Sequence, residues 1–445
     1  MTHYDRGMAA FEALFVPSGL RAAVSGRAWL EGMLESERAL VRAAAAAGLV
    51  PAAAAAEIEA ASDPARFDFE QLLEGGRAAG NPVEPLVRAL AASVGDDASR
   101  YVHRGATSQD VLDTAAMLVA RRAIRLVLDE ADRVVAACAV LAREHRSTPM
   151  AARTLLQQAV PTTFGLKAAG WLTGVAEARA LLAEMTDERL AAQLGGAAGT
   201  LSGFGHDGIR VLELYADELD LAVPALPWHT NRARIAELGG ALTVAAGAAA
   251  KIALDVLLLA QTEVGEVSAG AGASSTMPQK RNPVGAALAR ASARLAAMHA
   301  SVLTDALVHE HERAAGAWHA EWESLSGAVA HTGGALAAIA QTLEGLEVHP
   351  ERMRANLDLL GGLVLAERVA FRLLDRLGRA EAQAIVREAA AKAGDGASFR
   401  GALLADERAG FDAVELDELL DPATALGAAE ALVDRALELH AGAVA

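Results

Sequence analysis

The spacing of hydrophobic residues divides the chain into three parts. Up to about residue 100, short apolar stretches alternate with breaks, five of them at prolines between positions 17 and 85, which predicts short helices. From about residue 111 to residue 343, apolar side chains recur every three or four positions over long segments, which predicts long helices. Beyond His349 the stretches shorten again and are separated at Gly361-Gly362, 394–396 and Pro422.

Long helices with apolar faces wider than one seam can bury those faces only by packing into a bundle, within one chain or in an oligomer. We find no alternation that would predict strands and no repeat of solenoid length. The chain is also longer than one hydrophobic core usually supports. We therefore predict an all-α fold of three domains: an N-terminal helical domain at 1–110, a central helical bundle at 111–348 and a C-terminal helical domain at 349–445.

The composition agrees with a helical fold. Hydrophobic residues make up 53% of the 445 positions, and aromatic residues make up only 4%. Much of the hydrophobic content is alanine, a strong helix former whose small side chain lets helices approach closely. The formal charge of −17 argues against nucleic acid as a partner, because phosphate binding needs a basic face. A small anionic ligand remains open, since the lining of a cleft sets the field inside it.

Three features predict a cytoplasmic protein with no membrane as a partner. Cys138 is the single cysteine, so no disulfide can form within the chain. The first ten residues contain no apolar segment of signal-peptide length. The stretch 238–260 is apolar enough to suggest a membrane helix, but Lys251 and Asp255 interrupt it, so a helix buried in a bundle explains it better.

The most informative chemistry lies in the segment 268–283, which ends Gly-Ala-Ser-Ser-Thr-Met-Pro-Gln-Lys-Arg-Asn-Pro. Its glycines and serines predict a mobile loop that can close over a ligand. A serine hydroxyl is a weak base, so it needs N–H donors or a cation, and Lys280 could serve. A flexible surface loop would explain glycine and serine alone. The ordered Met-Pro-x-Lys-x-Asn-Pro tail argues against that alternative.

This tail resembles the signature of the fumarase/aspartase superfamily, Gly-Ser-Ser-x-Met-Pro-x-Lys-x-Asn-Pro. The resemblance implies that Ser274 transfers a proton and that Lys280 stabilises the substrate carboxylate that becomes an enediolate. Ala273 stands where the superfamily usually has glycine. The substrate-binding residues that the resemblance implies in this segment are Ser275, Met277 and Asn282.

A second segment, 102–114, leads into a predicted long helix. Thr107 or Ser108 is a natural N-cap, and Asp110 lies in the first turn. Capping alone would explain these residues, but free N–H groups at a helix start also bind carboxylates, and both interpretations can hold. The segment resembles the adenylosuccinate lyase and carboxymuconate cycloisomerase branches of the superfamily. By that resemblance Thr107 and Ser108 bind a substrate carboxylate, and His103 is a catalytic candidate at the edge of the site.

A third segment, 152–165, departs from the superfamily. Fumarases, argininosuccinate lyases and adenylosuccinate lyases usually have Arg-Thr-His-x-Gln here, but this chain has Leu155 in place of the histidine. The change counts against those three activities and leaves the second proton-transfer group unidentified. Arg153 and Gln157 remain substrate-binding candidates by resemblance.

A fourth set of segments, 227–234, 261–267 and 309–322, resembles the cycloisomerase branch in particular. Its histidines and glutamates could suggest a metal site, but no His-Glu-x-x-His spacing occurs, so we expect none. A polar helix face with ion pairs four residues apart is the simpler interpretation. The functional interpretation assigns Glu312 and Arg313 to the bound carboxylates.

Together these resemblances imply a cycloisomerase that lactonises a conjugated diene bearing three carboxylates. They also imply a homotetramer whose active sites combine several chains, with a small polycarboxylate substrate and no cofactor. An adenylosuccinate lyase-like enzyme or a lyase of a substituted succinate is the alternative. A non-catalytic assembly, as among lens crystallins, is disfavoured because Ser274, Lys280 and Asn282 are intact. A metal-dependent barrel enzyme is excluded, because it would need alternating strands and helices.

Overall fold

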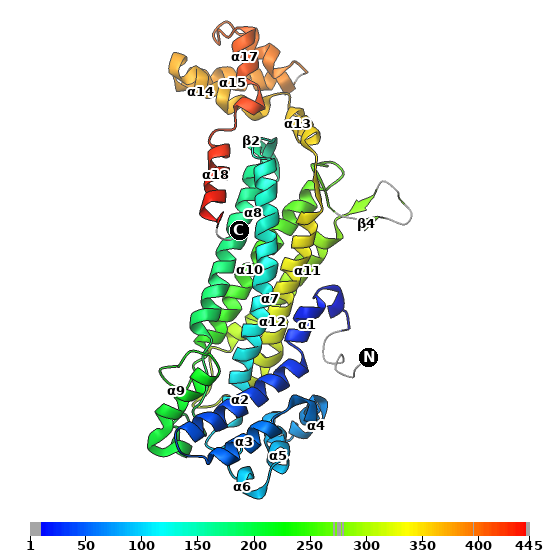
Figure 1. Cartoon of the computed structure of the whole chain (residues 1–445). Coiled ribbons are helices and arrows are strands. Elements are labelled where there is room, and N and C mark those ends of the chain that lie inside the picture. The colour runs from blue at the N-terminus through cyan, green and yellow to red at the C-terminus, as the bar shows by residue number, and fades with distance from the viewer. Residues whose placement is uncertain (1–9, 270–271, 274–276, 278–279, 395, 442–445) are drawn as a thin grey trace. The chain divides into compact units, whose positions relative to one another are not determined.

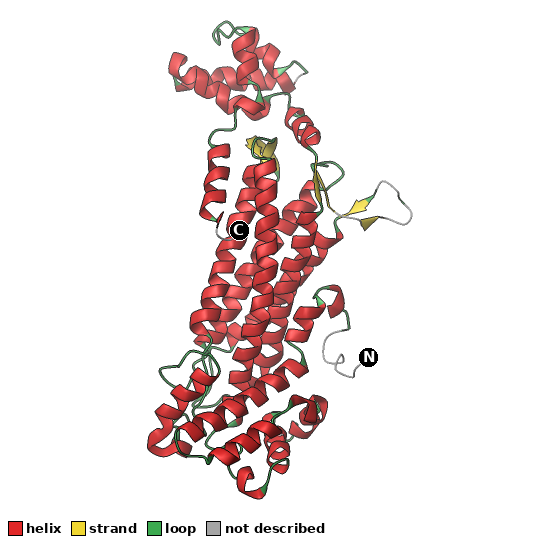
Figure 2. Cartoon of the chain, viewed as in Figure 1, coloured by secondary structure: helices red, strands yellow, loops and turns green. Residues whose placement is uncertain are grey.

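The structure is a computed structural model that describes residues 10–269, 272–273, 277, 280–394 and 396–441. Helices dominate the described chain, as Figure 2 shows, and the predicted all-α fold is confirmed. The α-helices are α1 (Ser18–Ala23), α2 (Gly26–Ala46), α3 (Ala52–Ala61), α4 (Phe69–Gly76), α5 (Val83–Ala92), α6 (Asp96–Ser99), α7 (Ser108–Glu144), α8 (Phe164–Glu184), α9 (Gly208–Glu218), α10 (Ala233–Leu259), α11 (Val284–Asp305), α12 (Ala317–Glu344), α13 (Pro350–Asp358), α14 (Ala366–Leu377), α15 (Arg379–Gly394), α16 (Phe399–Leu404), α17 (Ala413–Leu419) and α18 (Ala429–Leu439).

Contacts within the chain group it into two compact units. The first unit comprises Met1–Ala131, Glu177–Ala250 and Leu288–Ala338, and the second comprises Asp132–Ala176, Lys251–Ala287 and Ile339–Ala445. Helices α7, α10 and α12 each contribute residues to both units. The units are therefore built from segments that are distant in sequence. The division into three consecutive domains stays a prediction.

The long helices of the first unit run side by side (Figure 1), and small residues let them approach closely. A Cβ atom added to Gly327 of α12 would lie 2.4 Å from the His299 ring of α11. A Cβ atom added to Gly239 of α10 would lie 3.2 Å from Leu303 Cβ of α11. The hydroxyl of Thr332 on α12 donates to a carbonyl of α10 at 3.3 Å. Such close approaches explain why glycine and alanine are abundant and aromatic residues few.

The shorter helices of the first unit pack around α2. This helix contacts α3, α4 and α9, and Ser36 on α2 hydrogen-bonds the buried Tyr215 hydroxyl of α9 at 2.5 Å. The indole N–H of Trp29 donates to Ser326 of α12 at 3.0 Å. Helix α2 is therefore held on several sides, so a polar side chain on its buried face has a fixed position.

The second unit contains short antiparallel strand pairs that the sequence did not predict. The longest pair is β1 (Pro149–Thr154) with β2 (Gln157–Thr163). Leu155 and Leu156 form the turn between them, with φ of 49° and 65° and exposures of 97% and 75%. The expectation of no strands was wrong here because neither leucine is a usual residue for a left-handed turn. The other pairs are β3 (Val267–Ala269) with β6 (Leu346–Val348) and β4 (Gly272–Ala273) with β5 (Arg281–Asn282).

Helices α14 to α17 of the second unit enclose a separate small core. Leu373, Ile385, Phe399 and Leu403 are among its fully buried residues. The amphipathic pattern of these short helices, with one apolar face each, is sufficient to explain how they pack.

Helix α10 is the stretch for which the sequence raised a membrane helix. Among the described residues it is the one helix long and apolar enough to cross a membrane, with a mean hydropathy of 1.9 in its most apolar window. Only 44% of that window is buried within the chain. Lys251 and Asp255 pair with each other on this helix.

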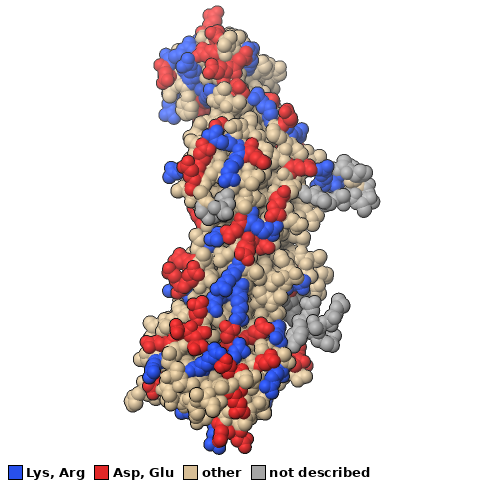
Figure 3. Space-filling view, in the orientation of Figure 1, with Lys and Arg blue, Asp and Glu red and all other residues tan. Residues whose placement is uncertain are grey.

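On the face drawn in Figure 3, acidic and basic side chains are interspersed.

Candidate active site

A buried carboxylate fixes the start of α7. Thr107 precedes the first helical residue, and its backbone N–H donates to Asp110 Oδ2 at 2.9 Å. The N–H of Asp110 donates in turn to the Thr107 carbonyl at 2.9 Å. An acidic side chain in the first turn that satisfies a donor ahead of the helix is one arm of a capping box. The predicted helix start at Thr107 and Ser108 is confirmed.

Asp110 also ties two other segments to this helix start. Its Oδ1 accepts the Gly195 N–H at 3.0 Å and lies 2.6 Å from His229 Nε2. Its Oδ2 accepts the Gly196 N–H at 2.9 Å. Counting the bond from Thr107, the carboxylate has four partners and is 1% exposed. Its acceptor capacity is therefore used in holding the site together.

The hydroxyl groups of Thr107 and Ser108 are in a different situation. Both residues are half-buried, and within the described part of the chain neither side chain has a hydrogen-bond partner. They lie at a helix N-terminus, where the backbone dipoles favour an anion. These two hydroxyls therefore differ from the neighbouring Asp110 carboxylate, which is saturated, and their predicted role in substrate binding stays a prediction.

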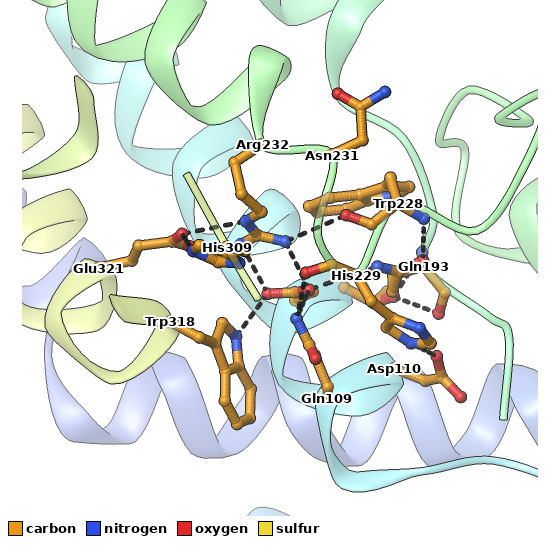
Figure 4. Close-up of polar contacts among 12 residues, drawn as sticks. Gln109, Asp110, Gln193, Trp228, His229, Asn231, Arg232, His309, Trp318 and Glu321 are labelled. Atoms are coloured by element: carbon orange, nitrogen blue, oxygen red, sulfur yellow. Dashed lines mark hydrogen bonds and ion pairs between the residues drawn. The ribbon is translucent and has the colours of Figure 1, made fainter. Parts of the chain in front are cut away.

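One turn further along α7, Asp113 belongs to a buried ion network. Figure 4 shows its members Arg232, Glu321 and Trp318 pointing toward one another. Arg232 donates to both oxygens of Asp113, at 2.8 and 3.0 Å, and its Nε donates to Glu321 Oε1 at 3.0 Å. The Trp318 indole N–H donates to Asp113 Oδ1 at 2.9 Å. Arg232 is 1% exposed, so water screens these charges little. The network fastens α7 to α12 and to the segment before α10.

Glu321 and His309 lie at the edge of this network. If Asp113, Arg232 and Glu321 were all ionised, the cluster would carry a net negative charge. Burial raises the pKa of Glu321 to about 7, although the Arg232 guanidinium opposes the shift. His309 Nε2 lies 3.3 Å from Glu321 Oε1, and burial, followed by Arg232, lowers the pKa of His309. Protonation of Glu321 near neutral pH would leave the buried cluster without net charge.

The first unit brings several predicted site residues to the start of α7. Arg313 donates to Gln109 Oε1 at 3.0 Å and to the Ala197 carbonyl at 2.9 Å. Gln109 is fully buried and donates to Asp113 at 3.1 Å, so the ion network also orients Arg313. His103 lies in the turn that leads into the helix, and its carbonyl accepts the Ala106 N–H at 3.4 Å. Glu312 is exposed beside Arg313.

The second unit holds the remaining predicted residues that are described. The Arg153 guanidinium donates to both oxygens of Glu266, at 2.9 and 2.7 Å, and Glu266 is fully buried. Asn356 donates to the same carboxylate at 2.8 Å. Gln157 is exposed in β2, and Asn282 is half-buried in β5. The Arg153 guanidinium is therefore held in an ion pair with a buried carboxylate.

Lys280 and Met277 are exposed, and the Lys280 N–H donates to the Met277 carbonyl at 3.0 Å. Ser274 and Ser275 lie outside the described residues. In the described ranges, no group of three or more His, Cys, Asp or Glu side chains is arranged to hold a metal ion. The roles of these residues and the absence of a metal stay predictions.

Sequence reasoning did not single out Asp113, Arg232 or Glu266, nor Glu37, whose Oε1 lies 2.6 Å from His103 Nδ1. One signal was available, because Asp110 and Asp113 are three residues apart and must share a helix face that is otherwise apolar. Nothing in the local sequence indicates that Arg232, 119 positions away, supplies the countercharge.

The profile of the family described as "Lyase" matches residues 18–297, and that described as "Adenylosuccinate lyase C-terminus" matches residues 362–436. The chain belongs to the lyase family that includes fumarase and aspartase.

Individual relatives carry different names. A nitrosuccinate lyase from Streptomyces davaonensis is 50% identical over 94% of this chain and 92% of its own length. A 3-carboxy-cis,cis-muconate cycloisomerase from Bradyrhizobium diazoefficiens is 46% identical over 95% of this chain and 96% of its own. The crystal structure of 3-carboxy-cis,cis-muconate lactonizing enzyme from Pseudomonas putida is similar with a TM-score of 0.92 and 41% identity, covering 98% of this chain and 100% of that one.

Replacing Arg232 tests the ion network. We expect Arg232→Leu to lower the free energy of unfolding by about 3 to 5 kcal/mol, because it leaves two buried carboxylates without their countercharge. The matched control is Arg189→Leu, since Arg189 pairs with Glu237 at an exposed position. The control should lose less than about 1 kcal/mol. Urea unfolding measures both variants, and equal losses would contradict the role given to Arg232.

Proposed function

We propose that the protein lactonises 3-carboxy-cis,cis-muconate, adding one substrate carboxylate to an alkene carbon β to another. The observation that carries the proposal is the start of α7, near Arg313, where the Thr107 and Ser108 hydroxyls have no hydrogen-bond partner among the residues that the structure describes. A site with several hydrogen-bond donors and a cation suits an anion whose charge grows during the reaction. The names of the Bradyrhizobium and Pseudomonas relatives support this choice of substrate.

In the proposed reaction, a carboxylate oxygen forms a bond to the β carbon, and the alkene electrons move into the neighbouring carboxylate to give an enediolate. The Ser274 hydroxyl then protonates the α carbon and regains its proton from solvent. Lys280 and Asn282 stabilise the enediolate, and no metal or cofactor takes part. Loss of one such donor typically raises the barrier by about 3 to 4 kcal/mol. We place the reaction in the cytoplasm, without nucleic acid or membrane as partners.

Elimination of nitrite from nitrosuccinate is the second candidate, supported by the relative that is 50% identical. The Ser274 oxyanion would take a proton from the carbon beside one carboxylate. The resulting enediolate would expel nitrite as the C–N bond breaks, leaving fumarate. This reaction needs the same carboxylate anchors, so the first unit suits both candidates, and the fit of the substituent decides between them.

Parallel assays of the purified protein distinguish the two. With 3-carboxy-cis,cis-muconate we expect ultraviolet absorbance to fall, because cyclisation interrupts the conjugated diene. With nitrosuccinate, a colorimetric nitrite assay and the rise of fumarate absorbance report elimination. Adenylosuccinate serves as the control for a general lyase. Faster release of nitrite than loss of the diene, compared as kcat/KM, would overturn the proposal in favour of the second candidate.

The role of Ser274 has its own test. We expect Ser274→Ala to reduce kcat by about 10²- to 10⁴-fold, the usual contribution of a proton-transferring group. Binding of the unreactive analogue propane-1,2,3-tricarboxylate, measured by calorimetry, should not change. Ser301→Ala is the matched control, because that exposed hydroxyl only donates to a carbonyl within α11. Wild-type turnover by Ser274→Ala would remove the serine from the mechanism.

We also propose that the chain is a homotetramer whose active sites combine residues of different chains. Two observations support this. Less than half of the most apolar window of α10 is buried within one chain. In addition, the β1–β2 turn next to Arg153 and Gln157 exposes two leucines. Leu155 is almost fully exposed, and Leu156 is largely exposed. Apolar surface of this kind is usually covered by a partner.

Mixing two inactive variants tests the shared site. If Arg153 and Ser274 reach one site from different chains, unfolding and refolding Arg153→Met together with Ser274→Ala restores about a quarter of the sites in a random symmetric assembly. Each variant refolded alone should stay inactive. Light scattering should give the mass of four chains for all samples. A tetramer without recovered activity would contradict the sharing, and a monomer would contradict the assembly.

A further inference from the structure

Glu37 is a buried carboxylate to which neither the proposed reaction nor the ion network gives a role. It lies on α2, and its side chain is 1% exposed. Its Oε1 lies 2.6 Å from Nδ1 of His103. A buried carboxylate is costly unless a hydrogen-bonded or charged partner compensates it, and His103 is that partner.

The backbone also restricts His103. Its φ of 57° is in the left-handed region, which a residue with a Cβ atom adopts only where the surrounding structure requires it. The residue lies four positions before Thr107, in the turn that leads into α7. Because Nδ1 faces Glu37, Nε2 is the ring nitrogen left for another partner. The side chain is 17% exposed, so a small ligand can reach the ring.

The charged groups around the ring favour its protonated form. Burial lowers the pKa of His103, but Glu37 from α2 and Asp110 from α7 outweigh burial, so the pKa is raised above 6.5. Tyr215 also lies close to Glu37, and it is fully buried, which raises its pKa, so it stays neutral. Asp110 is saturated by its four hydrogen bonds and does not compete for the ring.

We propose that Glu37 is a positioning residue that holds the His103 imidazole as a cation, with Nε2–H directed to a substrate carboxylate beside Thr107 and Ser108. His103 then acts as an anion anchor, and the proton transfer to carbon belongs to another group. A His–carboxylate pair of this kind fixes the orientation of the ring through one nitrogen and presents the other. The inference rests on the proposed carboxylate substrate but not on which reaction follows.

The kinetic test uses Glu37→Gln, which keeps an oxygen acceptor and removes the charge. With whichever substrate is turned over, KM should rise by about tenfold, as for loss of one charge-assisted hydrogen bond, while kcat changes little. The alkaline limb of the pH profile of kcat/KM should move to lower pH. In His103→Gln that limb should disappear, and adding Glu37→Gln should then have no further kinetic effect. An unmoved limb in Glu37→Gln would overturn the inference.

A stability measurement gives the sign of the linkage. Since the folded pKa of His103 is raised, the pair stabilises the fold fully below about pH 6.5, and this contribution is lost as pH rises through the folded pKa. Glu37→Gln should remove that part of the pH dependence. A loss of stability that is equal at all pH values would indicate a purely structural role for Glu37.

A spectroscopic test remains valid if neither proposed substrate reacts. The protein has 12 histidines, so NMR spectra of histidine-labelled wild type and His103→Gln identify the His103 resonance by difference. Its titration midpoint should fall in Glu37→Gln. Saturation with propane-1,2,3-tricarboxylate should raise the midpoint in the wild type. Binding of the tricarboxylate that leaves the His103 resonance unchanged would refute the anchor, whatever the reaction proves to be.

Discussion

Helix α7 carries two buried carboxylates, Asp110 and Asp113. The need of each for hydrogen-bonding or charged partners is the constraint on which the rest of the first unit depends. Asp110 is hydrogen-bonded by backbone N–H groups and His229, and Asp113 by Gln109, Trp318 and its countercharge Arg232. A buried charge is costly without such partners, so each segment that supplies one is held against the helix. The same bonds satisfy the donor ahead of the helix, and the hydroxyls at its start have no partner in the described part of the chain. Asp110 and Asp113 thus hold the segments together, and the ligand contact that we propose belongs to the neighbouring Thr107 and Ser108.

This division explains how one family can carry different reactions. The carboxylate anchors that we propose at the start of α7 would serve both addition to an alkene and elimination from a succinate, because both reactions increase the charge on a carboxylate. What distinguishes the two reactions is the group that attacks or leaves, and that choice depends on the shape of the rest of the pocket. Relatives named as a cycloisomerase and as a nitrosuccinate lyase, both with about half of the residues identical, are consistent with this separation.

The electrostatics are local rather than global. The chain carries a net charge of −17, yet Arg313 and His103 lie in the segments next to the start of α7, and each is held by a buried side chain, Gln109 and Glu37. In low dielectric, a cation fixed by a buried partner affects an anionic ligand more than distant surface charges do. In the proposal made for His103, the buried Glu37 carboxylate favours the protonated imidazole and so increases the ability of the site to bind anions.

The sequence by itself determined the helical fold, the start of α7 and the residues of the signature segment, because helix periodicity, capping and short motifs are local properties of the chain. It missed the β1–β2 hairpin, because the turn is formed by Leu155 and Leu156 and not by the glycine, asparagine or aspartate that usually marks such a turn. Only the tertiary structure decided that Arg232 joins Asp113 and Glu321, which lie 119 and 89 positions away, and that Glu37 meets His103 across 66 positions. Charge pairing has no period along the chain, so these partners become visible only when folding has buried them together.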